Sequence, residues 1–189
     1  MNVCEAFKKA LHMVEYEQVT HPDLKVQERV LCYELYHQLR LLEMCGVIDF
    51  RPARLQGELN KQAQHLFHEK EPIPDFLVHE PGTNNHNLGV VEVKRASANN
   101  EDLQYDLWKL ARFANHSELR YHEVILLISG KQEELNQAWR RIKRLSTRTG
   151  TTIQVLLHEV VNASVEHRKI RYSETKGPGP KGAREAAST

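Results

Sequence analysis

The stretch LGVVEVKRA, residues 88–96, predicts a strand that carries two charges and raises the first question about function. Its leucine and valines are typical of a buried β-strand. Glu92 and Lys94 interrupt this apolar run, and both lie on one face because successive side chains of a strand point to opposite faces. Burying two charges is costly unless they are paired or used. The strand is therefore expected to hold them for a purpose.

Composition limits the class of protein. A chain of 189 residues, of which 40% are hydrophobic, fits one domain with a substantial core. The net charge of +1 gives no overall preference for nucleic acid, so any such role depends on local patches. Three cysteines without a CxxC pair disfavour a disulfide framework and fit a reducing compartment. Without a long apolar run or a signal-like N-terminus, we expect a cytoplasmic protein that has no membrane partner.

Apolar periodicity predicts initial helices followed by strands that alternate with helices. The expected helices cover about 2–19, 25–45, 101–115 and 131–148, and the expected strands 73–80, 88–96, 121–129 and 151–160. Residues 54–62 fit either a strand or the start of a helix. This order indicates the α/β class, with a mixed central sheet flanked by helices. We expect a single domain over 1–172, with N-terminal helices in 1–46 and a catalytic core in 47–160, and a flexible tail over 173–189.

The turn cluster PGTNNHN, residues 81–87, predicts a hairpin between two of these strands. In a hairpin centred on Thr83–Asn84, opposed residue numbers add to about 167, which sets Asp75 near Glu92 and places Lys94 one step along the same face. Two adjacent carboxylates repel, and a divalent cation removes that conflict. Mg²⁺ prefers such oxygen donors, and a neighbouring lysine can hold water or stabilise a phosphorane. Hydrolysis of a phosphodiester requires these groups.

Pro74-Asp75, followed by Glu92-Val93-Lys94, resembles the motif of the PD-(D/E)xK nucleases. The order of elements over about residues 26–160 also resembles the αβββαβ core of restriction-endonuclease-like proteins. This resemblance implies a metal-dependent nuclease that acts most often on DNA, with Mg²⁺ as cofactor and Mn²⁺ as a substitute. It implies that Asp75, Glu92 and the Val93 carbonyl bind the metal, and that Lys94 positions or activates the attacking water.

The same resemblance implies a further glutamate on the first core helix, which completes the metal site. Glu34 lies on or beside the inward face of this helix and matches that role best, ahead of Glu28 and Glu58. A polar residue on the helix after the motif often assists the active site in this family. The candidates for contact with substrate or metal ligands are Gln104, Asp106, Lys109 and Arg95.

Other interpretations compete with this one. Glu92 and Lys94 also fit a structural ion pair at a sheet margin, and Glu34 fits a solvated position on its helix. His65 and His68 are favoured as a surface pair. The basic run within 140–148 is favoured as a solvated helix face, ahead of a phosphate-contacting surface. The fold also suits an inactive module that binds nucleic acid or assembles with a larger complex, and the resemblance leaves room for a homodimer or a partner protein that supplies specificity.

Overall fold

The structure is a computed structural model, and it describes residues 2–20, 26–57, 73–83 and 85–176. Glu58, His65 and His68 lie outside the described residues, as does most of the expected C-terminal tail.

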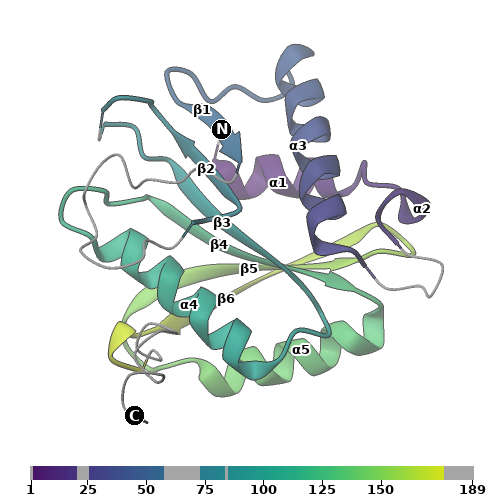
Figure 1. Cartoon of the computed structure of the whole chain (residues 1–189), viewed down its shortest axis with the longest axis vertical. Helices are drawn as coiled ribbons and strands as arrows, with labels where there is room; N and C mark the ends of the chain where they lie inside the picture. The colour runs from purple at the N-terminus through teal and green to yellow at the C-terminus, as the bar shows by residue number, and fades with distance from the viewer. Residues whose placement is uncertain (1, 21–25, 58–72, 84, 177–189) are drawn as a thin grey trace, which may run out of the picture.

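Six strands form one mixed sheet in the order β1-β2-β3-β4-β5-β6 (Figure 1). They are β1 (Arg54–Gly57), β2 (Phe76–His79), β3 (Gly89–Arg95), β4 (Glu123–Gly130), β5 (Thr151–Glu159) and β6 (Ser164–Tyr172). The first three strands pair antiparallel, β3, β4 and β5 pair parallel, and β6 returns antiparallel. A helix connects each parallel pair, as parallel strands require. The expected α/β class with a mixed sheet is confirmed.

Helices cover both faces of this sheet. They are α1 (Val3–Leu11), α2 (Tyr16–Val19), α3 (Glu28–Met44), α4 (Asn100–Asn115) and α5 (Gln132–Leu145), and a 3-10 turn, η2, follows at Glu174–Lys176. Figure 1 shows α1 and α3 on one face and α4 and α5 on the other, in agreement with their packing partners. Among the described helices, none has the length and apolar character needed to cross a membrane.

The two faces of β3 belong to two separate hydrophobic cores. Val91 and Val93 pack in the core beneath α1 and α3, whereas Val90 packs in the core beneath α4 and α5. Strands that are buried on both faces read as nearly continuous apolar runs, which explains the sequence of this strand. The alternation of side chains then turns Glu92 and Lys94 toward α4. The fold thus brings two charges of β3 to the face that α4 covers.

The hairpin of β2 and β3 has the register that the turn cluster predicts. Phe76 pairs with Val91 and Leu77 pairs with Val90. Both pairs add to 167, so the ladder has no bulge that would move Asp75 away from Glu92.

Other elements differ from those predicted from the sequence. Residues 2–19 form two helices, α1 and α2, because the chain leaves the helical conformation after Leu11. The ambiguous segment at 54 is strand β1. Strand β6 was not predicted, because its sequence SVEHRKIRY is rich in charge and buries only Ile170 and Tyr172 at the edge of the sheet.

A buried histidine beside β4 predicts how stability depends on pH. His158 is fully buried and its Nδ1 lies 2.9 Å from the Ser129 hydroxyl oxygen. Burial lowers the pKa of His158 from 6.5 to about 4, so the folded state binds fewer protons than the unfolded state between these values. The contribution of neutral His158 to stability is therefore complete above pH 6.5 and is lost as pH falls toward 4. Urea unfolding should show about 3 kcal/mol of this loss in the wild type but not in His158→Asn; equal pH slopes in the two proteins would contradict it.

Candidate active site

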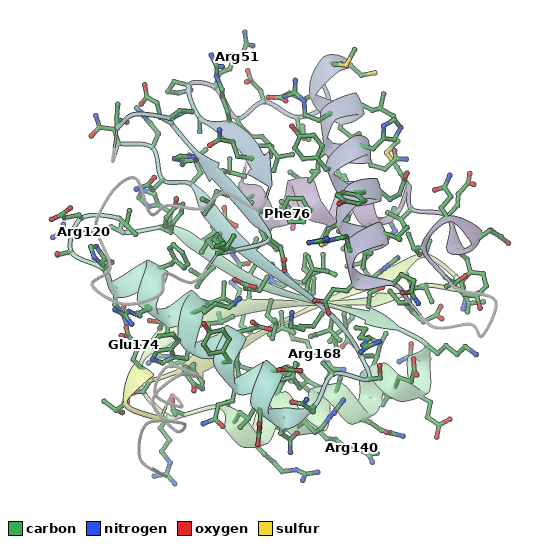
Figure 2. All side chains as sticks on the ribbon, in the orientation of Figure 1. Arg51, Phe76, Arg120, Arg140, Arg168 and Glu174 are labelled. Atoms are coloured by element: carbon green, nitrogen blue, oxygen red, sulfur yellow. The ribbon has the colours of Figure 1, made fainter. Side chains whose placement is uncertain are left out.

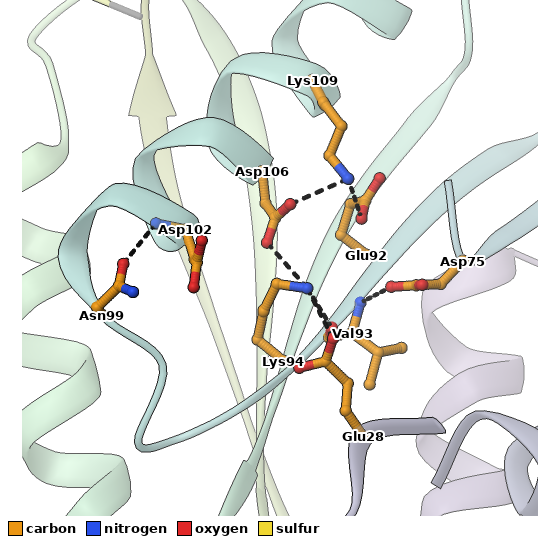
Figure 3. A network of polar contacts seen from close by, with 9 residues as sticks. All are labelled: Glu28, Asp75, Glu92, Val93, Lys94, Asn99, Asp102, Asp106 and Lys109. Atoms are coloured by element: carbon orange, nitrogen blue, oxygen red, sulfur yellow. Dashed lines mark hydrogen bonds and ion pairs between the residues drawn. The ribbon is translucent and has the colours of Figure 1, made fainter. Parts of the chain in front are cut away.

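The candidate site lies where β3 ends, between the start of α3 and the first turns of α4 (Figure 3). A hollow of about 450 Å³ opens there, lined mainly by charged and polar side chains from these three elements. Its charged lining residues are Glu28, Lys94, Arg95, Asp102, Asp106 and Lys109. In open α/β sheets, ligands bind outside the carboxyl ends of the parallel strands, and the hollow occupies such a position.

Asp75 stands just before β2 and is tied to the backbone of β3. Its Oδ2 accepts a hydrogen bond of 2.6 Å from the Val93 N–H. Burial raises the pKa of Asp75, while the Val93 N–H and the two lysines Lys94 and Lys109 act in the opposite direction. This hydrogen bond fixes the carboxylate beside the strand that carries the other two motif residues.

Glu92 forms a buried ion pair with α4. Its Oε2 lies 2.6 Å from the Nζ of Lys109, and the same ammonium lies 3.0 Å from Oδ1 of Asp106. Burial raises the pKa of Glu92 well above its usual value, whereas the charge of Lys109 lowers it. Burial alone would lower the pKa of Lys109, but Glu92 and Asp106 outweigh burial and raise it. Lys109 therefore stays charged and neutralises part of a buried carboxylate cluster.

Lys94 occupies the mouth of the same cluster. Its Nζ lies 2.8 Å from Oε1 of Glu28 and 3.5 Å from Oδ2 of Asp106, and it donates a hydrogen bond of 3.3 Å to the Val93 carbonyl. Burial on its own would lower the pKa of Lys94, but the charges of Asp106 and Glu28 raise it. The amine is therefore an ammonium ion at neutral pH, held between two carboxylates that come from different helices.

The helix glutamate at this site is Glu28 and not the expected Glu34. Glu34 accepts a hydrogen bond of 2.6 Å from the Gln38 side chain, and among the described contacts none joins it to Lys94 or Asp75. The charge of Glu28, in contrast, contributes to the pKa of both Asp75 and Lys94. Six residues of helix separate the two glutamates by about 9 Å along the axis. The first turn of α3 faces the site, so the described contacts bring Glu28, and not Glu34, to Lys94.

The other candidates divide between the site and its surroundings. Asp106 and Lys109 lie within the cluster, and Arg95 lines the hollow as an exposed side chain. Gln104 does not line the hollow, and its side chain instead lies near β6, where it lowers the otherwise raised pKa of Tyr172. Glu28 was expected to be a weaker candidate than Glu34. Its position as the first residue of α3 was the feature of the sequence that could have favoured it.

The donor set fits a divalent cation with few protein ligands. Among the described residues there is no group of three or more His, Cys, Asp or Glu side chains arranged to hold a metal ion. Oε1 of Glu92 is nevertheless buried without a hydrogen-bond partner in the described part of the chain. Asp75, Glu92 and the Val93 carbonyl supply hard oxygen donors, and Mg²⁺ is commonly held by one or two carboxylates and several waters.

A count of charges agrees with that fit. The carboxylates of Glu28, Asp75, Glu92 and Asp106 contribute −4, and the ammonium groups of Lys94 and Lys109 contribute +2, so the cluster carries a net −2 when all are ionised. One divalent cation would neutralise it.

Comparison with known proteins gives no relative: no protein-family model, curated protein or solved structure matches the chain.

Proposed function

We propose that this protein is a metal-dependent nuclease of the PD-(D/E)xK type, which hydrolyses phosphodiester bonds, most readily in DNA. One observation carries the proposal. Asp75 lies one step beyond the Phe76–Val91 pair, which sets it opposite Glu92, and it accepts the Val93 N–H, while Lys94 lines the polar hollow at the end of the same strand. The order α3-β1-β2-β3-α4-β4 supports the αβββαβ core that we propose for this fold.

In this proposal Asp75, Glu92 and the Val93 carbonyl hold Mg²⁺, for which Mn²⁺ can substitute. The bound cation would lower the pKa of a water molecule and stabilise the negative charge that develops on the phosphate. The chain itself would fix the oxygen atoms that bind the metal. The Val93 N–H orients Asp75, and Lys109 orients Glu92 by donating a hydrogen bond to its Oε2.

Lys94 serves as a fixed positive charge and not as the base that removes a proton. Its pKa is raised, so Nζ keeps its proton at neutral pH and has only hydrogen bonds to donate. An ammonium in this position would hold the attacking water and stabilise the phosphorane oxygens. Glu28 and Asp106 act as positioning residues, because they restrain the ammonium from both sides.

A second candidate function is an inactive nucleic-acid-binding or assembly module on the same scaffold. The ion pair between Glu92 and Lys109 favours it, since this pair satisfies one oxygen of Glu92 without a metal. The two candidates differ in metal binding. A nuclease should melt at a higher temperature in the presence of Mn²⁺, because a ligand of the native state stabilises that state, whereas an inactive module should not.

The proposed activity is tested by incubating the purified protein with labelled DNA and RNA, single- and double-stranded, in Mg²⁺, in Mn²⁺ and in EDTA. We expect cleavage of DNA in either metal and none in EDTA. Binding without cleavage of any substrate, in a protein that Mn²⁺ does not stabilise, would contradict the nuclease proposal and favour the inactive module.

Replacing each helix glutamate by glutamine separates their roles. Glu28→Gln removes the carboxylate that lies 2.8 Å from Lys94, and we expect cleavage to slow about tenfold or more because the ammonium loses its restraint. Glu34→Gln keeps a side chain that can still contact Gln38, and the rate should stay within about threefold of the wild type. Single-turnover cleavage at saturating metal measures both. A larger loss in Glu34→Gln than in Glu28→Gln would reverse the assignment.

A further inference from the structure

A second hollow, of about 480 Å³, adjoins the candidate active site. Its wall includes Ser97, which also lines the hollow at Lys94, and Asn100, the first residue of α4. The charged side chains of the wall come from α5. They are Glu134, Arg140, Arg141 and Arg144, so three guanidinium groups face a single carboxylate.

Arg141 binds the backbone of residues 96–98, the segment that lies between the two hollows. It donates hydrogen bonds from Nη1 to the Ala98 carbonyl and from Nη2 to the Ala96 carbonyl. Gly130 allows β4 to approach this segment closely, because a Cβ there would lie 2.6 Å from the Cβ of Ala96. The segment that leads from Lys94 to α4 is therefore held from two sides, and Arg141 has a structural role that makes it unsuitable for a test by mutation.

Arg140 and Arg144 are placed to serve a ligand. Both are exposed, and their spacing of four residues places them on one side of α5; Figure 2 shows Arg140 at the periphery of the molecule. The carboxylate of Glu134 caps the start of α5, because its Oε2 accepts a hydrogen bond of 3.1 Å from the Lys131 N–H. Planar guanidinium groups match the geometry of phosphate oxygens and bind them in pairs of hydrogen bonds.

The basic residues of the run within 140–148 are not all equivalent. Lys143 on α5 and Arg148 just after it are exposed and belong to this run, yet neither lines the hollow. On an ordinary solvated face, all four exposed side chains would be equally available to a ligand. Here only Arg140 and Arg144 of these four line the hollow, which distinguishes them from Lys143 and Arg148.

We propose that Arg140 and Arg144 bind a backbone phosphate of the nucleic-acid strand whose neighbouring phosphodiester lies at Lys94. This inference rests on the proposed function and extends it by naming a substrate-binding subsite. The carboxylate cluster repels an anionic polymer, because its charges sum to −2 when all of its groups are ionised and no cation is bound. Arg140 and Arg144 lie on the other side of Ser97, so they attract the phosphates of the strand without placing positive charge inside the carboxylate cluster.

The test compares two double variants that remove the same charge from the same basic run. Arg140→Gln/Arg144→Gln alters the hollow, and Lys143→Gln/Arg148→Gln is the matched control. Binding of a short labelled duplex DNA, and separately of a single-stranded RNA, is measured by fluorescence anisotropy in EDTA over a range of salt concentrations. All four positions are exposed, so both variants should keep the wild-type melting temperature.

We expect the arginine variant to weaken DNA binding about tenfold and to reduce the slope of log K against log salt by roughly 0.9, because one phosphate is no longer neutralised. The control should change the slope by less than half as much. Equal effects of the two double variants would overturn the subsite, because bulk charge alone would then explain binding. Weakened binding of the RNA probe only would assign the subsite to RNA and overturn the DNA assignment.

Cleavage separates this inference from the proposed function. A wild-type protein that cuts DNA, with an arginine variant that cuts with unchanged kcat and KM, would contradict the subsite and leave the nuclease proposal intact. A wild-type protein that binds and cuts neither probe would contradict the nuclease proposal itself.

Discussion

Replacing Lys94 by methionine should slow metal-dependent cleavage by about 10²–10⁴-fold without unfolding the protein. Methionine keeps the apolar stem of the side chain and removes the ammonium that Glu28 and Asp106 hold in place. Asp106 keeps a counter-charge in Lys109, so the loss of stability should be small compared with the loss of rate. The expected result is a drop in kcat at saturating metal with a nearly unchanged melting temperature.

The control for this variant is Lys143→Met, the same chemical change at an exposed position of α5. It should cleave at the wild-type rate. If Lys94→Met also cleaves at that rate, Lys94 has no part in the reaction and the proposed mechanism is wrong. If both variants lose activity together, the effect comes from total charge and not from the site.

Replacing Lys109 by methionine should have the largest effect on stability. It leaves Glu92, whose side chain is only 1% exposed, without its ion-pair partner, whereas Asp106 keeps Lys94 at 3.5 Å. Breaking a buried ion pair from one side costs about 3–5 kcal/mol, because the remaining charge is buried and uncompensated. Urea unfolding in EDTA measures this loss, and the melting temperature should fall by roughly 10 °C.

A second variant shows whether the disturbed charge balance is the cause. Glu92→Gln/Lys109→Met removes one charge of each sign, and it should recover more than half of the stability that Lys109→Met alone loses. Single and double variants of equal stability would mean that Lys109 does not neutralise Glu92. In that case the loss would come from packing of the lysine stem.

The geometry of the motif could be predicted because it depends on local rules. The turn cluster set the hairpin register, and the alternation of a strand put Glu92 and Lys94 on one face. The apolar run of β3 also predicted a buried strand at this position. These inferences needed only residues that are close in sequence, so the sequence contained what was required.

The partners of these residues depend on tertiary packing, and here the sequence was less informative. Glu28 reaches Lys94 across 66 positions because α3 begins beside the end of β3, which no periodicity indicates. Lys109 was expected only to reach substrate or neighbouring groups, yet it lies 2.6 Å from Glu92. The arginine hollow likewise arises from the packing of α5 against the segment after β3, so the basic run resembled an ordinary solvated face.

Binding of one divalent cation by Asp75 and Glu92 can be measured without knowing the substrate. Mn²⁺ binding to wild-type protein and to Asp75→Asn is followed by electron paramagnetic resonance, with melting temperatures as a check on folding. Asparagine can still accept the Val93 N–H, so the variant should remain folded. We predict one Mn²⁺ per wild-type chain and a loss of this binding in Asp75→Asn. A wild-type protein that binds no Mn²⁺, or a variant that binds it equally well, would contradict the proposed metal site.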